Sequence, residues 1–332
     1  MSLPPESAAA ASMARALLAG GELAITTHVN PDADGIGSAL ALAHALRRRG
    51  LRPMIYSADP VPRSCRFLPG VDDIVRVADA AAARALPPVE TLVTVDCGAA
   101  DRIAHLAELR HSRVLVIDHH AGPGDFGDQR LVRPQSECTA RLIDEVVAAL
   151  ELPRDATHAT CCFAGLVFDT GRFMHANTGP DAFRLAAALA DTGIDIGAIN
   201  RALSYTRSRD DLAREALAIE RLRVDADEPR LAGIALDADA LERIGRPDDW
   251  GETIEIPRSL AGVEIAYLMR EAPDRASVRC SLRCNPPWAV RPVAEHFGGG
   301  GHDCAAGCTI EGDLDRACRH LLPALRAVLA RG

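Results

Sequence analysis

The chain has 332 residues, of which 48% are hydrophobic and 25% charged, so it is long enough for two soluble globular domains. A formal net charge of −9 argues against a protein that grips long nucleic acid, because such binding depends on neutralising many phosphates. No apolar stretch approaches the roughly 20 residues needed to span a bilayer, and Met1–Ala11 lacks a basic cluster, so we expect a cytoplasmic protein that makes no membrane contact.

The first part of the chain alternates between strand and helix patterns. Short apolar and β-branched runs predict buried strands at residues 23–27, 51–56, 91–95 and 113–117. Helical spacing covers residues 36–49, which end at Gly50, and residues 157–168. This alternation favours a mainly parallel sheet, and we expect an α/β catalytic domain over residues 1–195.

The rest of the chain predicts a linker and a smaller α/β domain. Residues 193–223 look mostly helical, and we expect a helical linker at 196–225. Strand patterns return at 231–236, 263–269 and 277–283, before the glycine cluster Gly298–Gly301. The second domain is therefore expected over residues 226–332.

Polar side chains gather where predicted strands end. His28, Asp96 and Asp118 each come directly after or at the end of such a strand, and Asp169 ends a helical, apolar run. In open α/β sheets the carboxyl ends of the strands are where ligands bind. The sequence therefore predicts a site at this edge of the sheet.

Four segments supply candidate metal ligands. His28, Asp32 and Asp34 lie in an expected loop after the first strand, although capping of the next helix would also account for the two acids. Asp118, His119 and His120 are adjacent, and neighbours in an extended segment point in opposite directions, so we expect the two histidines to differ in role. A functionless surface histidine pair is the alternative.

Asp96 and Asp169 complete the set. Each acid follows an apolar run and is followed closely by a glycine, a pattern that a helix cap or turn would also produce. Together the four segments offer several carboxylates and two or three imidazoles. This mixed oxygen and nitrogen set suits manganese or a similar divalent ion.

These four segments resemble, in order and in type, the motifs of the DHH phosphoesterases, including the eponymous Asp118-His119-His120. Residues 298–302, Gly-Gly-Gly-Gly-His, followed by Ala305-Ala306-Gly307, resemble the glycine-rich motif of the DHH-associated C-terminal domain. Within the family, residues 67–70 (Phe-Leu-Pro-Gly), residues 169–173 (Asp-Thr-Gly-Arg-Phe) and the single compact C-terminal domain are most similar to the nanoRNase and pAp phosphatase group.

The resemblance implies a two-metal hydrolase. One cation, Mn²⁺ with Mg²⁺ as the alternative, would be held by His28, Asp32 and Asp96, and a second by Asp34, Asp96, His119 and Asp169. Asp96 would bridge the two, and the attacking group would be a hydroxide that the metals activate. His120 would contact the scissile phosphate or assist the leaving group, or else support the metal site.

The resemblance also implies the substrate. Five residues of the second domain are expected to hold it in a cleft between the domains: Arg283, Gly299, Gly300, Gly301 and His302. The expected reactions are hydrolysis of short oligoribonucleotides to mononucleotides and of pAp to AMP. The alternatives are a phosphodiesterase for cyclic or linear dinucleotides (c-di-AMP, pGpG) and a non-catalytic nucleotide-binding protein. Long nucleic acid is not expected as a partner, whereas a homodimer is compatible with this assignment.

Overall fold

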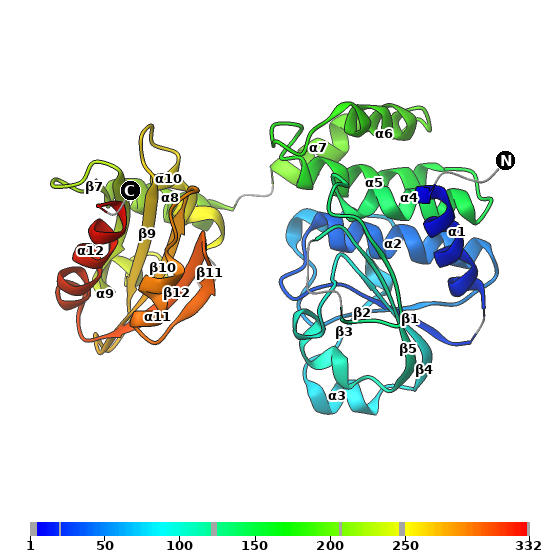
Figure 1. The fold of residues 1–332 in the computed structure, drawn as a ribbon, viewed down its shortest axis with the longest axis horizontal. Coiled ribbons are helices and arrows are strands. Elements are labelled where there is room, and N and C mark those ends of the chain that lie inside the picture. The colour runs from blue at the N-terminus through cyan, green and yellow to red at the C-terminus, as the bar shows by residue number, and fades with distance from the viewer. Residues whose placement is uncertain (1–4, 20, 121–124, 206–207, 246–249, 331–332) are drawn as a thin grey trace. The chain divides into compact units, whose positions relative to one another are not determined.

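The computed structural model describes residues 5–19, 21–120, 125–205, 208–245 and 250–330. The chain divides into two compact units, Met1–Thr206 and Arg207–Gly332 (Figure 1). The range expected to be a linker contains helix α7 (Ile196–Ser204) in the first unit and α8 (Arg209–Glu220) in the second. No helix in the described part of the chain is long and apolar enough to cross a membrane.

The first unit is built on a six-stranded parallel sheet with the strand order β3-β2-β1-β4-β5-β6. The mainly parallel α/β domain expected from the sequence is therefore confirmed. The strands are β1 (Leu23–Thr26), β2 (Met54–Ser57), β3 (Ile74–Arg76), β4 (Val89–Val95), β5 (His111–Asp118) and β6 (Gln129–Val132).

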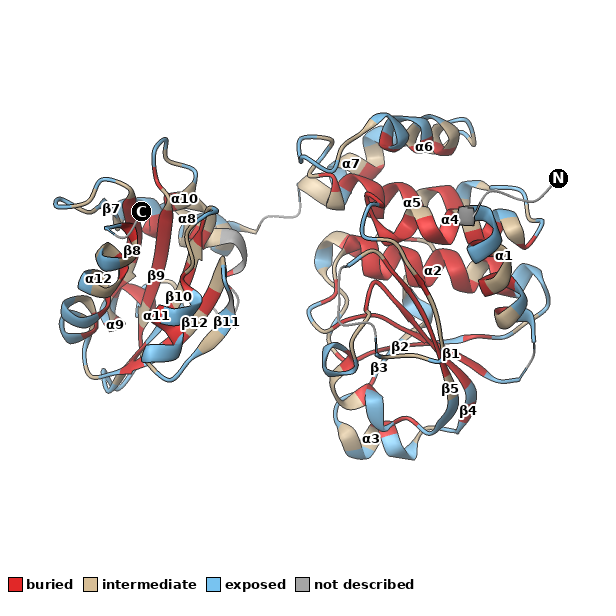
Figure 2. Ribbon diagram, viewed as in Figure 1, coloured by how far each residue is buried: buried red, intermediate tan, exposed pale blue. Residues whose placement is uncertain are grey.

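Helices cover both faces of this sheet because its strands are apolar on both sides (Figures 1 and 2). Ile25 packs into a core with α2, α4 and α5, whereas its neighbour Ala24 faces α3 and a 3₁₀ segment. Helices α6 and α7 pack on α5. The helices are α1 (Pro5–Leu18), α2 (Ala33–Arg48), α3 (Ala80–Ala85), α4 (Thr139–Ala149), α5 (Ala156–Asp169) and α6 (Pro180–Ala190), and the 3₁₀ segment is Ala100–Glu108.

Helix α2 begins earlier than the apolar spacing predicts. It starts at Ala33 because the side chain of Asp32 accepts hydrogen bonds from the backbone N–H groups of Asp34 and Gly35. The expectation that Asp34 lies in a loop is therefore wrong. Helix α2 also lies very close to α5, since a Cβ atom on Gly37 would come within 2.5 Å of the Cys161 carbonyl oxygen.

The second unit is built on a mixed sheet with the order β11-β12-β10-β9-β8-β7, in which only the β8–β9 pair is parallel among the described strands. This confirms the smaller α/β domain. Its strands are β7 (Leu222–Val224), β8 (Leu231–Leu236), β9 (Ile265–Glu271), β10 (Ser277–Cys284), β11 (Gly300–His302) and β12 (Ala305–Glu311).

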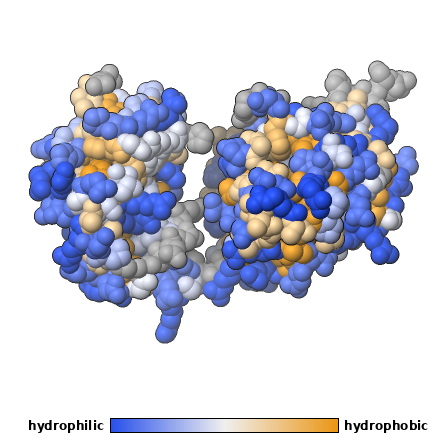
Figure 3. Space-filling view, turned by 90° about the horizontal axis from the view of Figure 1, so that it is seen from below, coloured by the Kyte–Doolittle hydropathy of each residue, from blue (hydrophilic) through white to orange (hydrophobic). Residues whose placement is uncertain are grey.

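Two hydrophobic clusters hold this second sheet. One packs β9, β10 and β12 against α11 (Arg291–His296) and α12 (Leu314–Leu329). The other packs β8 and β9 against α8, α9 (Ala238–Glu242) and the segment around Ile254, which precedes α10 (Glu255–Arg258). On the face that Figure 3 shows, hydrophilic side chains predominate, and hydrophobic side chains gather in patches between them. All ten cysteines are free thiols.

Candidate metal centre

The candidate site lies where the strand order of the first sheet reverses. Strands β1 and β4 are neighbours, and from this pair the chain builds outward to β2 and β3 on one side and to β5 and β6 on the other. Such a switch point opens a crevice at the carboxyl ends of the strands. His28 follows β1 and Asp96 follows β4, so the topology brings these two side chains together.

His28 is buried, and its ring is oriented by the backbone. Its Nδ1–H donates to the Val29 carbonyl oxygen at 2.8 Å, which leaves Nε2 facing two carboxylates. Nε2 lies 3.3 Å from Asp96 Oδ2 and 3.5 Å from Asp32 Oδ2. Burial lowers the pKa of His28, but the carboxylates of Asp32 and Asp96 outweigh it and raise the pKa to about 10.

Asp32 and Asp34 lie at the N-terminus of α2 but in different surroundings. One carboxylate oxygen of Asp32 caps the helix, and the other faces His28. Burial raises the pKa of Asp32, but the bonds from His28 and from the helix N–H groups lower it overall. Both proposals for this acid, helix cap and metal ligand, are thus compatible with one another.

Asp34 is fully buried, and its carboxylate also accepts hydrogen bonds from the start of a second helix. Its two oxygens accept hydrogen bonds from the N–H groups of Thr139 (2.6 Å) and Ala140 (2.9 Å), at the start of α4. This carboxylate therefore occupies the N-terminus of α4, whose own N-cap Cys138 makes no side-chain bond. Burial, followed by the charges of Asp96 and Asp169, raises the pKa of Asp34 well above its ordinary value.

Asp96 occupies the centre of the site. It adopts a left-handed backbone conformation (φ 58°) and accepts a 2.8 Å hydrogen bond from the Thr139 hydroxyl. Its Oδ1 lies 3.6 Å from His119 Nε2, while its Oδ2 faces His28. The two oxygens of one carboxylate therefore point toward the two histidines.

His119 and Asp169 form the far side of the site. Asp169, the last residue of α5, places Oδ2 3.0 Å from His119 Nε2, yet this buried oxygen accepts no hydrogen bond with acceptable geometry in the described structure. Burial lowers the pKa of His119, but Asp169 and Asp96 raise it to about 9. Burial raises the pKa of Asp169. A buried carboxylate oxygen without a donor is what a cation would satisfy.

His120 lies at the edge of the site and is 55% exposed. Strand β5 ends at Asp118, and the ring of His120 is held by Asp118, whose Oδ1 accepts bonds from both the backbone N–H and Nδ1 of His120. The bond to Asp118 raises the pKa of His120. Because the chain turns after β5, both histidine rings lean toward Asp96 Oδ1, although only His119 also contacts Asp169.

Together these side chains form three overlapping groups that can hold a metal ion. Within each group the ligand atoms lie within 4.8 Å of one another. The groups are His28, Asp32 and Asp96; Asp34, His119 and Asp169; and Asp96, His119 and His120. Carboxylate and imidazole donors fit a divalent cation of the Mn²⁺ or Mg²⁺ kind, and the unsatisfied oxygen of Asp169 supports the fit.

Comparison with known proteins identifies the family of this chain. Residues 22–166 match the model of the DHH family, N-terminal domain. A bifunctional oligoribonuclease and PAP phosphatase from Thermus thermophilus is 31% identical over 94% of this chain and 91% of its own length. The chain belongs to the DHH family. The predictions of a DHH phosphoesterase and of a hydrolase that acts on phosphoester bonds are confirmed.

Other similarities extend over both units of this DHH protein. The Bacillus subtilis bifunctional oligoribonuclease and PAP phosphatase is 24% identical over 85% of this chain and 87% of its own length. Among solved structures, an exopolyphosphatase-related protein from Bacteroides fragilis matches with a TM-score of 0.83 and 23% identity, covering 96% of each chain. The last match supports the fold alone.

The DHH unit contains supporting residues that the sequence did not indicate. Thr139 bonds Asp96 through its hydroxyl and Asp34 through its N–H, and the Ser136 carbonyl accepts from His119 Nδ1 at 3.2 Å. A Cβ on Gly165 would lie 2.4 Å from Asp34 Oδ1. The only signal in the sequence was a Ser and a Thr ahead of an apolar helical run, which is typical of a helix start and not of a metal site.

The substrate-binding residues expected in the second unit lie along β10, β11 and the turn before β11. Arg283 is half-buried on β10, and its guanidinium donates to the Leu282 carbonyl oxygen. Gly299 precedes β11, and a Cβ there would lie 2.1 Å from the Gly307 carbonyl oxygen. Gly300 and Gly301 pair with Gly307 and Ala306, and His302 pairs with Ala305 through its backbone, whereas the His302 side chain lies outside the described structure.

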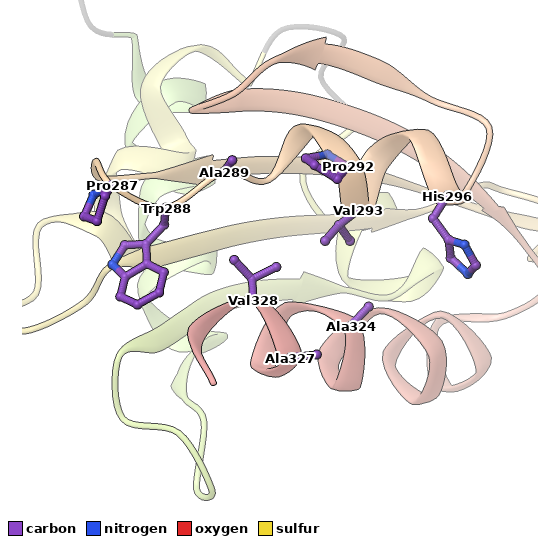
Figure 4. A pocket seen from close by; sticks show the side chains of 9 residues that line it. All are labelled: Pro287, Trp288, Ala289, Pro292, Val293, His296, Ala324, Ala327 and Val328. Carbon is purple, nitrogen blue, oxygen red and sulfur yellow. The ribbon is translucent and has the colours of Figure 1, made fainter. Parts of the chain in front are cut away.

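Close packing of β11 on β12 thus requires glycine at position 299, whatever ligand binds there. The DHH protein also has an apolar pocket of about 540 Å³ between α11, α12 and the turn at 287–289 (Figure 4). Trp288 lies at one end and His296 at the other, with Val293 and Val328 facing the space between them. None of the residues expected to form the active site lines it.

Proposed function

We propose that this DHH enzyme hydrolyses short oligoribonucleotides to mononucleotides and removes a phosphate from pAp to give AMP, using two divalent cations, Mn²⁺ or Mg²⁺. The observation that carries the proposal is the position of Asp96, whose two oxygens face two separate groups of ligands. The substrate class is supported by the activity named for the Thermus thermophilus relative.

Each cation would have its own side of the site. His28, Asp32 and Asp96 would hold one, and Asp34, Asp96, His119 and Asp169 the other. When bound, such a pair supplies an activated water and neutralises charge on the phosphoryl oxygens. The protein's part is to fix these donors, because Val29 and Ser136 orient the two imidazoles and the α4 N-terminus holds Asp34.

His120 would act on the substrate and not as a ligand. Its Nδ1 is engaged by Asp118, which leaves Nε2 of this exposed ring available. The bond to Asp118 raises the pKa of His120 and so favours the protonated ring, from which Nε2 can donate to a phosphate oxygen or protonate the leaving oxygen. Proton donation by His120 should be lost as the pH rises through the raised pKa of this ring.

The second unit would recognise the substrate. Arg283 suits a phosphate, and the glycines in the turn before β11 and in β11 itself carry no side chains that would keep a ligand from the backbone. The net charge of −9 fits this short-substrate role and disfavours long nucleic acid.

The test is a substrate panel with purified protein and Mn²⁺ or Mg²⁺. We expect release of mononucleotides from a diribonucleotide and of phosphate from pAp. If neither is turned over while pGpG or c-di-AMP is, the dinucleotide phosphodiesterase alternative replaces the proposal. If no substrate is hydrolysed and calorimetry detects no divalent ion binding, the result favours the alternative of a non-catalytic nucleotide-binding protein.

A further inference from the structure

Cysteines of the second unit lie opposite each other across strands β10 and β12. The antiparallel register pairs Cys280 directly with Cys308 in the middle of these strands. One step beyond the last pair of the same register, Cys284 lies opposite Cys304, and the Cys284 N–H donates to the Cys304 carbonyl oxygen at 3.1 Å. The described part of this unit therefore contains two thiol pairs, an inner pair (Cys280 and Cys308) and an outer pair (Cys284 and Cys304).

The two thiols of the outer pair point to the same place. Cys284 Sγ lies 3.1 Å from the Trp288 carbonyl oxygen, and Cys304 Sγ lies 3.8 Å from that same oxygen. Directly opposed side chains in an antiparallel pair have Cβ atoms about 4.5–5.5 Å apart, whereas a disulfide holds them about 3.5–4.5 Å apart. A small movement of the backbone would therefore allow a bond between the two sulfur atoms.

The backbone permits this movement more readily at the outer pair than at the inner pair. Cys304 lies in the turn between β11 and β12. Cys280 lies within β10 and is paired on both sides, with Met269 of β9 and with Cys308 of β12. A turn adjusts its backbone more easily than the middle of a three-stranded ladder. We therefore expect the outer pair to form a disulfide more easily.

Exposure also separates the four thiols. Cys304 is partly exposed, whereas Cys284, Cys280 and Cys308 are only 2%, 1% and 6% exposed. An oxidant in solution therefore reaches Cys304 first. Burial, helped by the contact with Cys304, raises the pKa of Cys284 to about 12, so the Cys284 thiol keeps its proton. An accessible thiol beside a second thiol that can react with its oxidised form is the arrangement of redox-sensing cysteines.

The outer pair lies next to the residues assigned to substrate recognition. Cys284 directly follows Arg283, and Cys304 comes two positions after His302, the last residue of β11. A bond between the two sulfurs would draw the β11–β12 turn toward the end of β10. It would thus change the position of β11 relative to Arg283.

We propose that Cys284 and Cys304 form a reversible disulfide when the protein meets a peroxide, and that this bond weakens substrate binding by the second unit. The effect on substrate rests on the proposed function, whereas formation of the disulfide does not. Cytosolic disulfides are for the most part transient bonds of this redox-sensing kind.

The reaction proceeds in two steps. The Cys304 thiolate attacks one oxygen of hydrogen peroxide, the O–O bond breaks, and the second oxygen leaves as water after it takes up a proton. The Cys284 sulfur then attacks the sulfenic acid on Cys304, and the hydroxyl group leaves as water with the Cys284 proton. Two thiols are oxidised by two electrons and one peroxide is reduced to two waters. A dithiol reverses the bond by exchange.

The disulfide is tested on the full-length protein by mass spectrometry after hydrogen peroxide treatment and removal of the peroxide with catalase. We expect the intact protein to lose two hydrogen atoms, and a non-reducing peptide map to link Cys284 to Cys304 while Cys280 and Cys308 remain thiols. A link within the inner pair, a disulfide between two chains, or sulfinic acid at Cys304 without a link would overturn the proposal.

Two variants identify the reacting thiol. Cys304→Ser should abolish the loss of mass. Cys318→Ser, which removes another partly exposed thiol on α12, is the matched control and should react as the wild type does. Circular dichroism checks that both variants fold. If Cys304→Ser does not fold, the peptide map of the wild type decides alone.

The effect on substrate is measured by steady-state hydrolysis of a diribonucleotide with Mn²⁺. Oxidation should raise KM severalfold with kcat unchanged in the wild type and in Cys318→Ser, and should leave KM of Cys304→Ser unchanged. Dithiothreitol should restore the original KM, which separates the disulfide from methionine sulfoxide because a thiol reagent does not reverse the latter within the assay.

The outcomes separate the proposal from the proposed function. Cross-linked protein with an unchanged KM would overturn the regulatory effect. If the link forms but neither the reduced nor the oxidised protein hydrolyses any oligoribonucleotide, the proposed function fails while the modification site stands.

Discussion

The two units of this DHH protein place their charged groups in opposite settings. In the first unit, the carboxylates of Asp34 and Asp96 are buried at the ends of strands and helices, and backbone or hydroxyl donors hold them in place. In the second, Arg279 projects from the middle of a strand into solvent and Arg283 is half-buried on the same face. The first setting holds the carboxylates through hydrogen bonds inside the core, and the second offers an adaptable charged face.

The buried carboxylates of the first unit suit the chemical step, whereas the exposed arginine of the second suits substrate recognition. A buried carboxylate with a fixed position suits a cation whose geometry must be maintained during hydrolysis. An exposed arginine suits a flexible backbone whose phosphates vary in position. We therefore expect changes in the first unit to alter kcat and metal affinity, and changes on the charged face of the second to alter KM.

The largest effect should come from Asp96→Ala. Its loss removes a donor from both ligand groups, and we expect kcat to fall by a factor of about 10²–10³ or more with the fold retained. Steady-state kinetics and circular dichroism check this, with the exposed Asp72→Asn as the control. Retention of normal activity would refute the central role of Asp96.

Metal affinity should depend steeply on pH. Without metal, His28 and His119 have pKa values of about 10 and about 9, so at neutral pH a cation must displace their protons. Affinity should rise about tenfold per pH unit for each proton released, up to about pH 9. Calorimetry in buffers of different ionisation enthalpy counts these protons, and a flat profile between pH 6 and 8 would contradict the prediction.

The same pKa shifts predict the stability of the metal-free protein. The pKa values of His28 and His119 in the folded state are both raised above 6.5. The stabilisation of the fold by these two histidines is therefore complete below pH 6.5 and is lost as the pH rises through about 9 to 10. Chelator-treated protein should therefore melt at lower temperature at pH 9.5 than at pH 6.5. Saturating Mn²⁺ should reduce that difference, because the cation replaces the protons.

A smaller effect is expected for Thr139→Val, which keeps the shape of the side chain and removes the hydroxyl bonded to Asp96. Loss of such a supporting bond should lower activity or metal affinity about 10–100-fold. Thr139→Ser, which keeps the hydroxyl, serves as the rescue variant. Equal activity of the valine and serine variants would show that the bond does not position Asp96.

The smallest expected effect comes from tighter packing when Gly165 is replaced by alanine. A methyl group on Gly165 would lie 2.4 Å from Asp34 Oδ1 and 2.9 Å from Ala140 Cβ, so Gly165→Ala should cost about 1–3 kcal/mol of unfolding free energy and disturb the site. Chemical denaturation measures the cost. Gly179→Ala, which has open space around it and an ordinary φ, should cost less than about 1 kcal/mol.

The sequence alone predicted the parallel sheet and the ends of its main strands, because buried strands are continuous apolar runs and polar residues mark where they stop. It also predicted which acids and histidines come together, since the carboxyl ends of neighbouring parallel strands share one edge. The short strands β3, β6, β7 and β11 gave no comparable pattern, because their side chains are few and partly exposed.

Only the tertiary structure decided how the site is held. The bonds from Thr139 and Ala140 to Asp34 join residues more than 100 positions apart, and the approach of α5 at Gly165 depends on helix packing that no local pattern records. The opposition of Arg270 and Arg279 likewise follows from strand register, which long-range pairing sets. The sequence shows each candidate site residue individually, whereas the distances between their side chains depend on how the chain packs.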